Sequence, residues 1–234
     1  MGESPIILAV DTSDFDTARA WIEATRESID IYKLGLEFFL TFGAQGVKAI
    51  SEESGASIFL DLKLHDIPNT VKKSVGVVDN LHPRFLTVHA SGGAAMVAAA
   101  VSAATTTSIT AVTVLTSLAD ADLSDLGYAK PSLETAVSMA RVATQAGATS
   151  IVCSPLEIAA IRAVIPQSVS IITPGVRPSD ETGQDDQVRT MTPAQAMAAG
   201  ANFLVIGRPI TSRWSQGKAA MASRASQLVA SIHE

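Results

Sequence analysis

Three charged side chains gather in the segment FLDLKLHDIPNTV, residues 59–71: Asp61, Lys63 and Asp66. The segment opens as a buried strand, so the charges come where that strand ends. Alternate residues of a regular strand share a face, which predicts that Asp61 and Lys63 point to one side and the neighbouring leucines to the other. The carboxylate and the ammonium would then be neighbours, in a place where core packing does not call for charge.

These charges form a set of alternating sign when Lys33, at the end of the run IYKLG, is added to them. An isolated charge in a site that excludes water costs on the order of several kcal/mol, and neighbours of opposite sign allow each member to stay ionised. Fixed charges of this kind stabilise the charge that develops in a reaction. The pattern therefore indicates a functional site.

The charged segment belongs to a repeated pattern of short apolar runs separated by longer segments of helical period. The eight runs are PIILAVD, IYKLG, SIFLDLKL, RFLTVHA, SITAVTVL, SIVCSP, SIITPG and ANFLVIGRP. Runs that are nearly continuous in Val, Ile and Leu are typical of parallel strands covered by helices on both faces. Eight such units in succession predict an α/β protein, a single (β/α)8 TIM barrel formed by residues 1–234.

An open, doubly wound sheet is the structural alternative to a closed barrel. Its dinucleotide-binding form has no support, because no GxGxxG motif follows the first strand. Two longer loops interrupt the pattern, around residues 117–131 after the fifth run and around residues 176–190 after the seventh. No Pro/Gly-rich linker divides the chain into domains.

Polar or charged residues stand at the carboxyl ends of most of the runs. In a barrel these ends share one rim, where the loops after the strands form the active site of essentially every characterised enzyme of this fold. The residues expected on this rim are Asp11, Lys33, Gly35, Asp61, Lys63, His89, Thr116 and Arg208. Positions far apart in the sequence would thus meet in one pocket.

Composition excludes several other classes of function. The formal net charge of −6 and the absence of any basic run argue against nucleic-acid binding, which needs clustered Lys and Arg. The first apolar run is too short for a signal peptide or a membrane span, so no membrane association is expected. The only cysteine, Cys153, lies in an apolar run and suits a buried thiol in a reducing compartment. These features predict a cytoplasmic protein.

The segment FLDLKLHDIPNTV resembles the DxKxxD signature of the orotidine 5'-monophosphate decarboxylases. That short motif is shared with decarboxylases and aldolases of sugar phosphates, but further elements follow in family order: ILAVD, YKLG, VTVLTS, TPGVR, DDQVR and VIGR. The sugar-phosphate relatives carry an acidic, metal-associated residue where Lys33 stands. The resemblance therefore favours the orotidine 5'-monophosphate branch and covers nearly the whole chain.

The resemblance implies removal of CO2 from C6 of orotidine 5'-monophosphate to give UMP, with neither a metal nor an organic cofactor. It implies that Lys63 donates the proton and that Asp61 and Asp66 hold and aim it. Asp61 would also lie near the substrate carboxylate, where a repulsion is relieved as CO2 leaves. The other implied roles are ribose binding by Asp11 and Lys33, pyrimidine binding by Thr116, and action in the partner's site of a homodimer by Asp66 and Thr70.

Candidates for phosphate binding lie after the last two strands, where barrels often hold phosphate. Gly207 offers backbone N–H groups and Arg208 a guanidinium fork, while Arg177 and Gln187 lie on the long loop after the seventh strand. That loop is long and polar enough to act as a lid.

Less specific interpretations remain for individual residues. A single charge at a strand end, such as Asp11 or Asp66, is often only part of a solvated turn. His65 and His89 are assigned no role: His65 is a neighbour of the motif, and no second histidine or acidic cluster gives His89 the spacing of metal ligands. Two other functions stay open: a metal-dependent sugar-phosphate decarboxylase, aldolase or epimerase, and a barrel that binds nucleotides without turnover.

Overall fold

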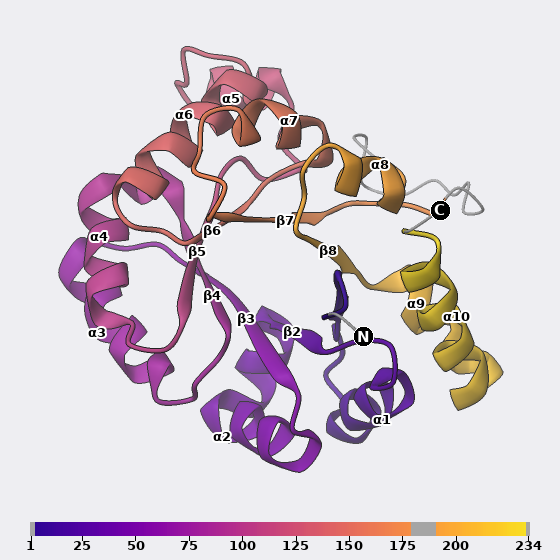
Figure 1. Cartoon of the computed structure of the whole chain (residues 1–234). Helices are drawn as coiled ribbons and strands as arrows, with labels where there is room; N and C mark the ends of the chain where they lie inside the picture. Colours follow the sequence, from indigo (N-terminus) through magenta and orange to yellow (C-terminus); the bar gives the residue numbers. More distant parts are fainter. Residues whose placement is uncertain (1–2, 179–190, 233–234) are drawn as a thin grey trace.

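Eight parallel strands close into a barrel in the computed structural model, which describes residues 3–178 and 191–232. Each strand pairs with the next in sequence, and β8 pairs with β1 to complete the ring (Figure 1). The strands are β1 Ile6–Ala9, β2 Ile31–Gly35, β3 Ser57–Leu64, β4 Phe85–His89, β5 Ser108–Val112, β6 Ser150–Val152, β7 Ser170–Pro174 and β8 Phe203–Ile206. Each of the eight apolar runs contains one strand. The predicted TIM barrel is confirmed and the open-sheet alternative is wrong.

Helices form an outer ring around the strands (Figure 1). Their bounds are α1 Phe15–Thr25, α2 Leu36–Ser54, α3 Pro68–Asp79, α4 Gly93–Ala103, α5 Asp120–Asp125, α6 Ser132–Gln145, α7 Ile158–Arg162, α8 Pro193–Ala198, α9 Arg208–Thr211 and α10 Lys218–Ala230, with short 3-10 turns at Ala90–Gly92, Pro155–Glu157 and Ser212–Gln216. The expected long loop after β5 contains the short helix α5. Within the described residues, none of these helices is both long and apolar enough to cross a membrane.

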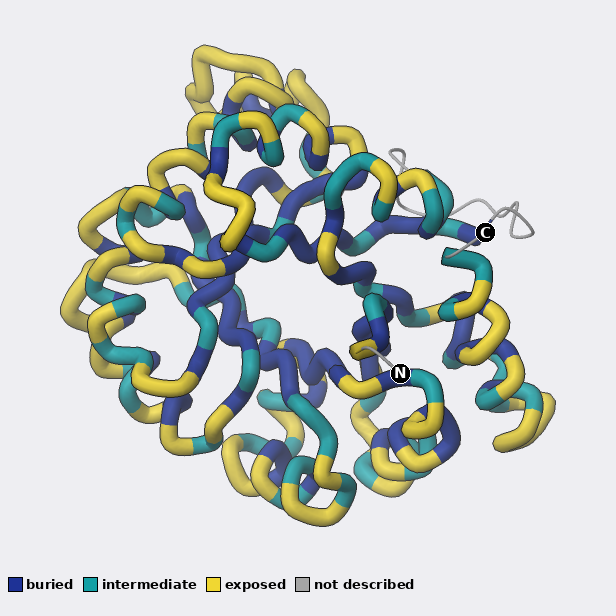
Figure 2. Tube along the Cα trace, in the orientation of Figure 1, coloured by how far each residue is buried: buried dark blue, intermediate teal, exposed yellow. Residues whose placement is uncertain are grey.

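The strands are buried on both faces, as their composition predicts. The strands are mostly dark blue, that is buried, in Figure 2. One face packs against the helices in the larger core cluster, and the other fills the barrel interior. The interior layer consists of Ile7, Ile31, Phe59, Phe85, Ile172 and Phe203. Because strand residues alternate between faces, positions two residues beyond this layer also point inward, towards the carboxyl end of the barrel. This places Lys33 and Asp61 above an apolar floor.

Candidate functional site

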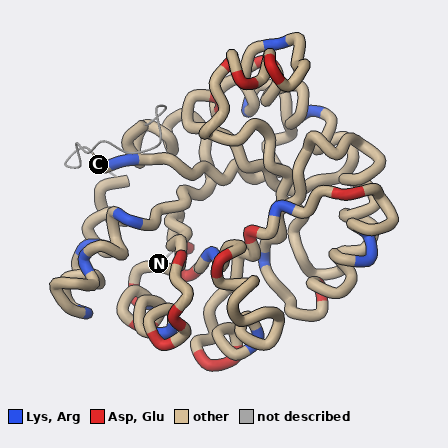
Figure 3. Tube along the Cα trace, turned by 180° about the vertical axis from the view of Figure 1, so that it is seen from behind, with Lys and Arg blue, Asp and Glu red and all other residues tan. Residues whose placement is uncertain are grey.

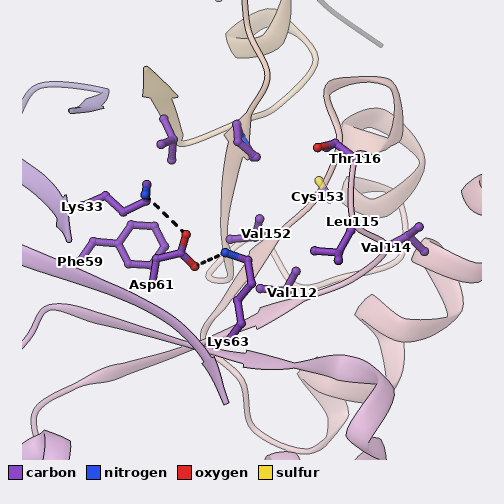
Figure 4. Close-up of a pocket in the computed structure, with 12 residues that line it drawn as sticks. Lys33, Phe59, Asp61, Lys63, Val112, Val114, Leu115, Thr116, Val152 and Cys153 are labelled. Carbon is purple, nitrogen blue, oxygen red and sulfur yellow. Dashed lines mark hydrogen bonds and ion pairs between the residues drawn. The ribbon is translucent and has the colours of Figure 1, made fainter. Parts of the chain in front are cut away.

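Asp61 lies between two lysines above the barrel floor. Its Oδ1 accepts a hydrogen bond from Lys63 Nζ at 2.7 Å, and its Oδ2 lies 3.7 Å from Lys33 Nζ (Figure 4). Lys33 Nζ in turn donates to Asp11 Oδ1 at 3.0 Å. Three members of the alternating charge set predicted from the sequence, Lys33, Asp61 and Lys63, are thus joined by ion pairs. Asp11, which follows β1, extends this network, whereas the fourth predicted member, Asp66, has no ion pair with it among the described residues.

Burial and charge act in opposite directions on Asp61, whose side chain is 15% exposed. Loss of water by burial would by itself raise its pKa, but Lys33, Lys63 and a hydrogen bond from Thr87 together hold the pKa below its usual value. Asp61 therefore stays a carboxylate at neutral pH.

Figure 3 shows most charged positions on the outer helices, while inside that ring acidic and basic positions lie next to one another beside the first strands.

The strand β3 that carries both Asp61 and Lys63 is irregular between Leu60 and Leu64. The prediction of regular alternation of side chains is therefore wrong at this point. β3 and β4 are in register up to Leu60 and Leu86, and the next pair is Leu64 and Val88. Three residues of β3 thus face one residue of β4, a bulge in which Lys63 has φ of 50°. A side chain other than glycine in this region costs on the order of 1–3 kcal/mol, and such strain is concentrated at functional sites.

Thr87 is the single β4 residue opposite this bulge, and its side chain is fully buried. Its Oγ1 accepts from the backbone N–H of Lys63 at 2.8 Å and donates to Asp61 Oδ1 at 3.0 Å. The sequence reasoning missed this residue. A polar residue inside the apolar run RFLTVHA was the available signal, but its partner on β3 depends on a register that the sequence does not reveal.

A cavity of about 210 Å³ opens beside the charged residues. Apart from these charges and Thr116, its walls are apolar, and they come mainly from strands around the barrel (Figure 4). The lining residues are Lys33, Phe59, Asp61, Lys63, Val112, Val114, Leu115, Thr116, Val152, Cys153, Pro174 and Val205. Pockets for drug-sized ligands are typically about 300–1,000 Å³, so this one fits a single ring better than a whole nucleotide. Thr116, the residue expected to meet the pyrimidine, lies at its wall.

Cys153 is buried in the wall of this cavity, as its apolar run predicts. Burial raises the pKa of its thiol strongly, with a smaller contribution from Glu157. The thiolate that would act as a nucleophile is therefore disfavoured.

Within the described residues, Asp66 and Thr70 take no part in the ion network of their own chain. Asp66 is exposed, and its carboxylate accepts a hydrogen bond from the backbone N–H of Ile67 at 2.6 Å. Thr70 is exposed in the first turn of α3. Among residues 3–178 and 191–232, Lys63 forms its ion pair with Asp61 and none with Asp66. The two residues are thus accessible from outside the chain.

The candidate phosphate ligands follow β7 and β8. Gly207 directly precedes α9, and Arg208 is exposed in its first turn. Arg177 follows β7. Its neighbour Val176 forms an isolated β-bridge with Met191, and the backbone N–H of Arg177 donates to Met191 O at 2.9 Å. Gln187 and most of the expected lid lie outside the described residues.

His65 and His89 lie next to each other, with ring centroids 5.4 Å apart. Burial lowers the pKa of His89, and the neighbouring His65 and Lys63 lower it further. Both rings border a second, smaller cavity of about 140 Å³. Within the described part of the chain, no group of three His, Cys, Asp or Glu side chains is arranged to hold a metal ion.

Comparisons with known proteins identify a family and relatives of the same fold. The sequence model described as "Orotidine 5'-phosphate decarboxylase / HUMPS family" matches residues 4–222. The orotidine 5'-phosphate decarboxylase of Thermobifida fusca is 48% identical over 219 residues, which covers 94% of each chain. The enzyme of the same name from Wolbachia pipientis is 43% identical over 210 residues, covering 89% of this chain and 92% of the relative.

Solved structures show the same likeness. The crystal structure of orotidine 5'-phosphate decarboxylase from Lactobacillus acidophilus has a TM-score of 0.83 and 29% sequence identity, and the match covers 99% of this chain and 100% of that one. The enzyme of that name from Pyrococcus horikoshii, at 22% identity and a TM-score of 0.77, shares the fold.

Proposed function

The chain belongs to the orotidine 5'-phosphate decarboxylase / HUMPS family, and from this premise we propose that it converts orotidine 5'-monophosphate to UMP and CO2. This is a carboxy-lyase reaction of de novo pyrimidine biosynthesis. The observation that carries the proposal is the ion network of Lys33, Asp61 and Lys63 at the wall of an apolar cavity that fits one ring.

The chemistry requires a stabilised carbanion and then a proton. When the bond between C6 and the carboxylate breaks, its electron pair stays on C6 as CO2 departs. The ammonium of Lys63, held by Asp61, would stabilise this charge and then deliver a proton to C6 to give UMP. Solvent would return a proton to the lysine after product release. These roles need no group beyond the chain's own side chains.

The substrate would extend from the cavity to the rim. The pyrimidine would occupy the apolar cavity beside Thr116, and Asp11 and Lys33 would hold the ribose hydroxyls. The phosphate would lie at the ends of β7 and β8, where Gly207, Arg208, Arg177 and Gln187 are the proposed ligands. Phosphate binding far from C6 could then be used to assemble the charged site.

We also propose a homodimer in which Asp66 and Thr70 act in the partner's site. Their exposure supports this, as does the pairing of Lys63 with Asp61 and not with Asp66 among the described residues of one chain. In a two-fold dimer such a contact is reciprocal. The remaining parts of the proposal are a single domain over residues 1–234 and a cytoplasmic location, with which the buried free thiol of Cys153 agrees.

A direct assay tests the activity. Purified protein treated with EDTA and freed of metal should decarboxylate orotidine 5'-monophosphate at the untreated rate, followed by pyrimidine absorbance and by release of CO2. A rate that falls with EDTA and returns with a divalent cation would favour a sugar-phosphate enzyme on the same barrel. Tight UMP binding without any turnover would instead indicate a binding protein.

Replacing Arg208 should weaken binding of the phosphate. We expect Arg208→Ala to raise the KM for orotidine 5'-monophosphate about 30-fold or more, which corresponds to ~2 kcal/mol, because a charge-assisted contact is lost. Steady-state kinetics with the nucleotide and with the nucleoside orotidine would measure this. The nucleoside should show little difference between variant and wild type.

Arg26→Ala is a matched control for Arg208→Ala. Arg26 is an exposed arginine at the end of α1, paired with Glu23 at 3.1 Å, and that end of the helix lies at the amino end of the barrel. Its replacement should leave the kinetics unchanged. Equal losses of Arg208→Ala on the nucleoside and on the nucleotide would remove the phosphate role from Arg208.

A further inference from the structure

We infer that Thr87 is a positioning residue for the reaction: its hydroxyl fixes Asp61 and the backbone of Lys63 in one geometry. This inference rests on the proposed decarboxylase function. Thr87 lies on β4 opposite the segment that carries Asp61 and Lys63, and it does not line the cavity. It would therefore act only through Asp61 and Lys63.

The bulge of β3 creates the need for such a residue. Between the paired residues Leu60 and Leu64, the β3 backbone cannot follow the regular ladder with β4. The N–H of Lys63 is instead bound by the side chain of Thr87 at 2.8 Å. An amide in a buried position needs a partner, and here a side chain replaces the missing strand contact. This contact supports the positive φ of Lys63, which determines where its ammonium points.

The same hydroxyl also orients the carboxylate. Having accepted from Lys63 N, Thr87 Oγ1 has one proton to donate, and it donates it to Asp61 Oδ1 at 3.0 Å. Asp61 Oδ1 also accepts a hydrogen bond from Lys63 Nζ at 2.7 Å, and the other carboxylate oxygen, Oδ2, faces Lys33. One hydroxyl thus connects the backbone of the proton donor to the carboxylate that holds its ammonium. Misplacement of a catalytic group by about 1 Å can cost 100-fold in rate.

The geometry makes valine and serine informative replacements. Valine keeps the size of Thr87 but removes the hydroxyl, and serine keeps the hydroxyl but loses the methyl group. We expect Thr87→Val to lower kcat for orotidine 5'-monophosphate about 10- to 100-fold with a KM within about 3-fold of wild type. Thr87→Ser should keep kcat within about 3-fold of wild type.

Thr110→Val is the matched control. Thr110 is the β5 residue in register with Thr87 and is also fully buried, but its hydroxyl pairs with Ser150 and not with the ion network. If hydroxyl loss acts only through stability, both valine variants should lower the melting temperature and neither should change kcat. If the inference is right, only Thr87→Val lowers kcat among variants that remain folded by circular dichroism.

The pH profile gives a second readout. A hydrogen bond to a carboxylate favours its ionised form, so losing the Thr87 hydroxyl should move the acidic limb of kcat/KM to higher pH. The charged and titratable groups that face Asp61 are Lys33 from β2, Lys63 on β3 and His89 from β4. All three are retained in Thr87→Val, so the shift would report on the hydroxyl.

The outcomes separate this inference from the function on which it rests. A wild-type protein without decarboxylase activity would overturn the proposed function. An active wild type with a folded Thr87→Val variant of unchanged kcat and unchanged pH profile would overturn only the role of Thr87. A Thr87→Ser variant as slow as Thr87→Val would do the same, because the hydroxyl would then not be the group that matters.

Discussion

Lys63→Ala should lose at least about 100-fold in kcat while it still binds UMP with nearly the wild-type affinity. Lys63 is the proposed source of the proton for C6 and the cation nearest to Asp61, so its loss removes both the acid and the charge stabilisation. The product lacks the carboxylate and is held mainly by its base, ribose and phosphate. Single-turnover kinetics and calorimetric titration with UMP would measure the two quantities.

Lys48→Ala is a suitable control for this variant. Lys48 is an exposed lysine on α2 whose partner is Glu52 at 3.7 Å, and an exposed pair of this kind contributes only about 0.3–0.5 kcal/mol to stability. Its kinetics should equal those of wild type. Retention of more than a few per cent of the wild-type rate by Lys63→Ala would show that another group protonates C6.

A solvent-isotope experiment adds a chemical check. In deuterium oxide the lysine ammonium exchanges its protons, so UMP formed by the wild type should carry deuterium at C6. Product without deuterium would mean that the proton comes from a site that does not exchange with solvent, and the role of Lys63 as proton donor would fail.

Mixing two inactive variants should restore activity if the active sites are shared between subunits. Lys63→Ala and Asp66→Asn chains should each be nearly inactive alone. After subunit exchange, a heterodimer has one site with both native residues and one site with neither. Random mixing in equal amounts gives about half heterodimers, so recovery should approach about a quarter of wild-type activity.

Exchange must be verified independently of activity. Chains with two different tags, purified in sequence on both tags, would yield heterodimers alone, whose activity should approach about half that of wild type. Heterodimers without recovered activity would show that Asp66 serves its own chain. A protein that sediments as a monomer at assay concentrations would overturn the shared site altogether.

The sequence by itself determined the barrel and most of the charged rim. Eight apolar runs in order, most of them closed by a polar or charged residue, leave few arrangements other than parallel strands closed in a ring. Lys33 and Asp61 could be placed together because both stand at the carboxyl ends of neighbouring strands. Patterns of this kind are local, so they can be read without knowledge of the partner strand.

Only the tertiary structure decided how Lys63 meets Asp61. Regular alternation predicted the contact, but a bulge with positive φ produces it, and Thr87 on the next strand binds both residues. The apolar walls of the cavity likewise come from strands far apart in the sequence. Register between strands arises from packing over the whole barrel, and a strand's own period of two does not contain it. For this reason the sequence indicated the charged residues, while the group that positions them became visible only in the fold.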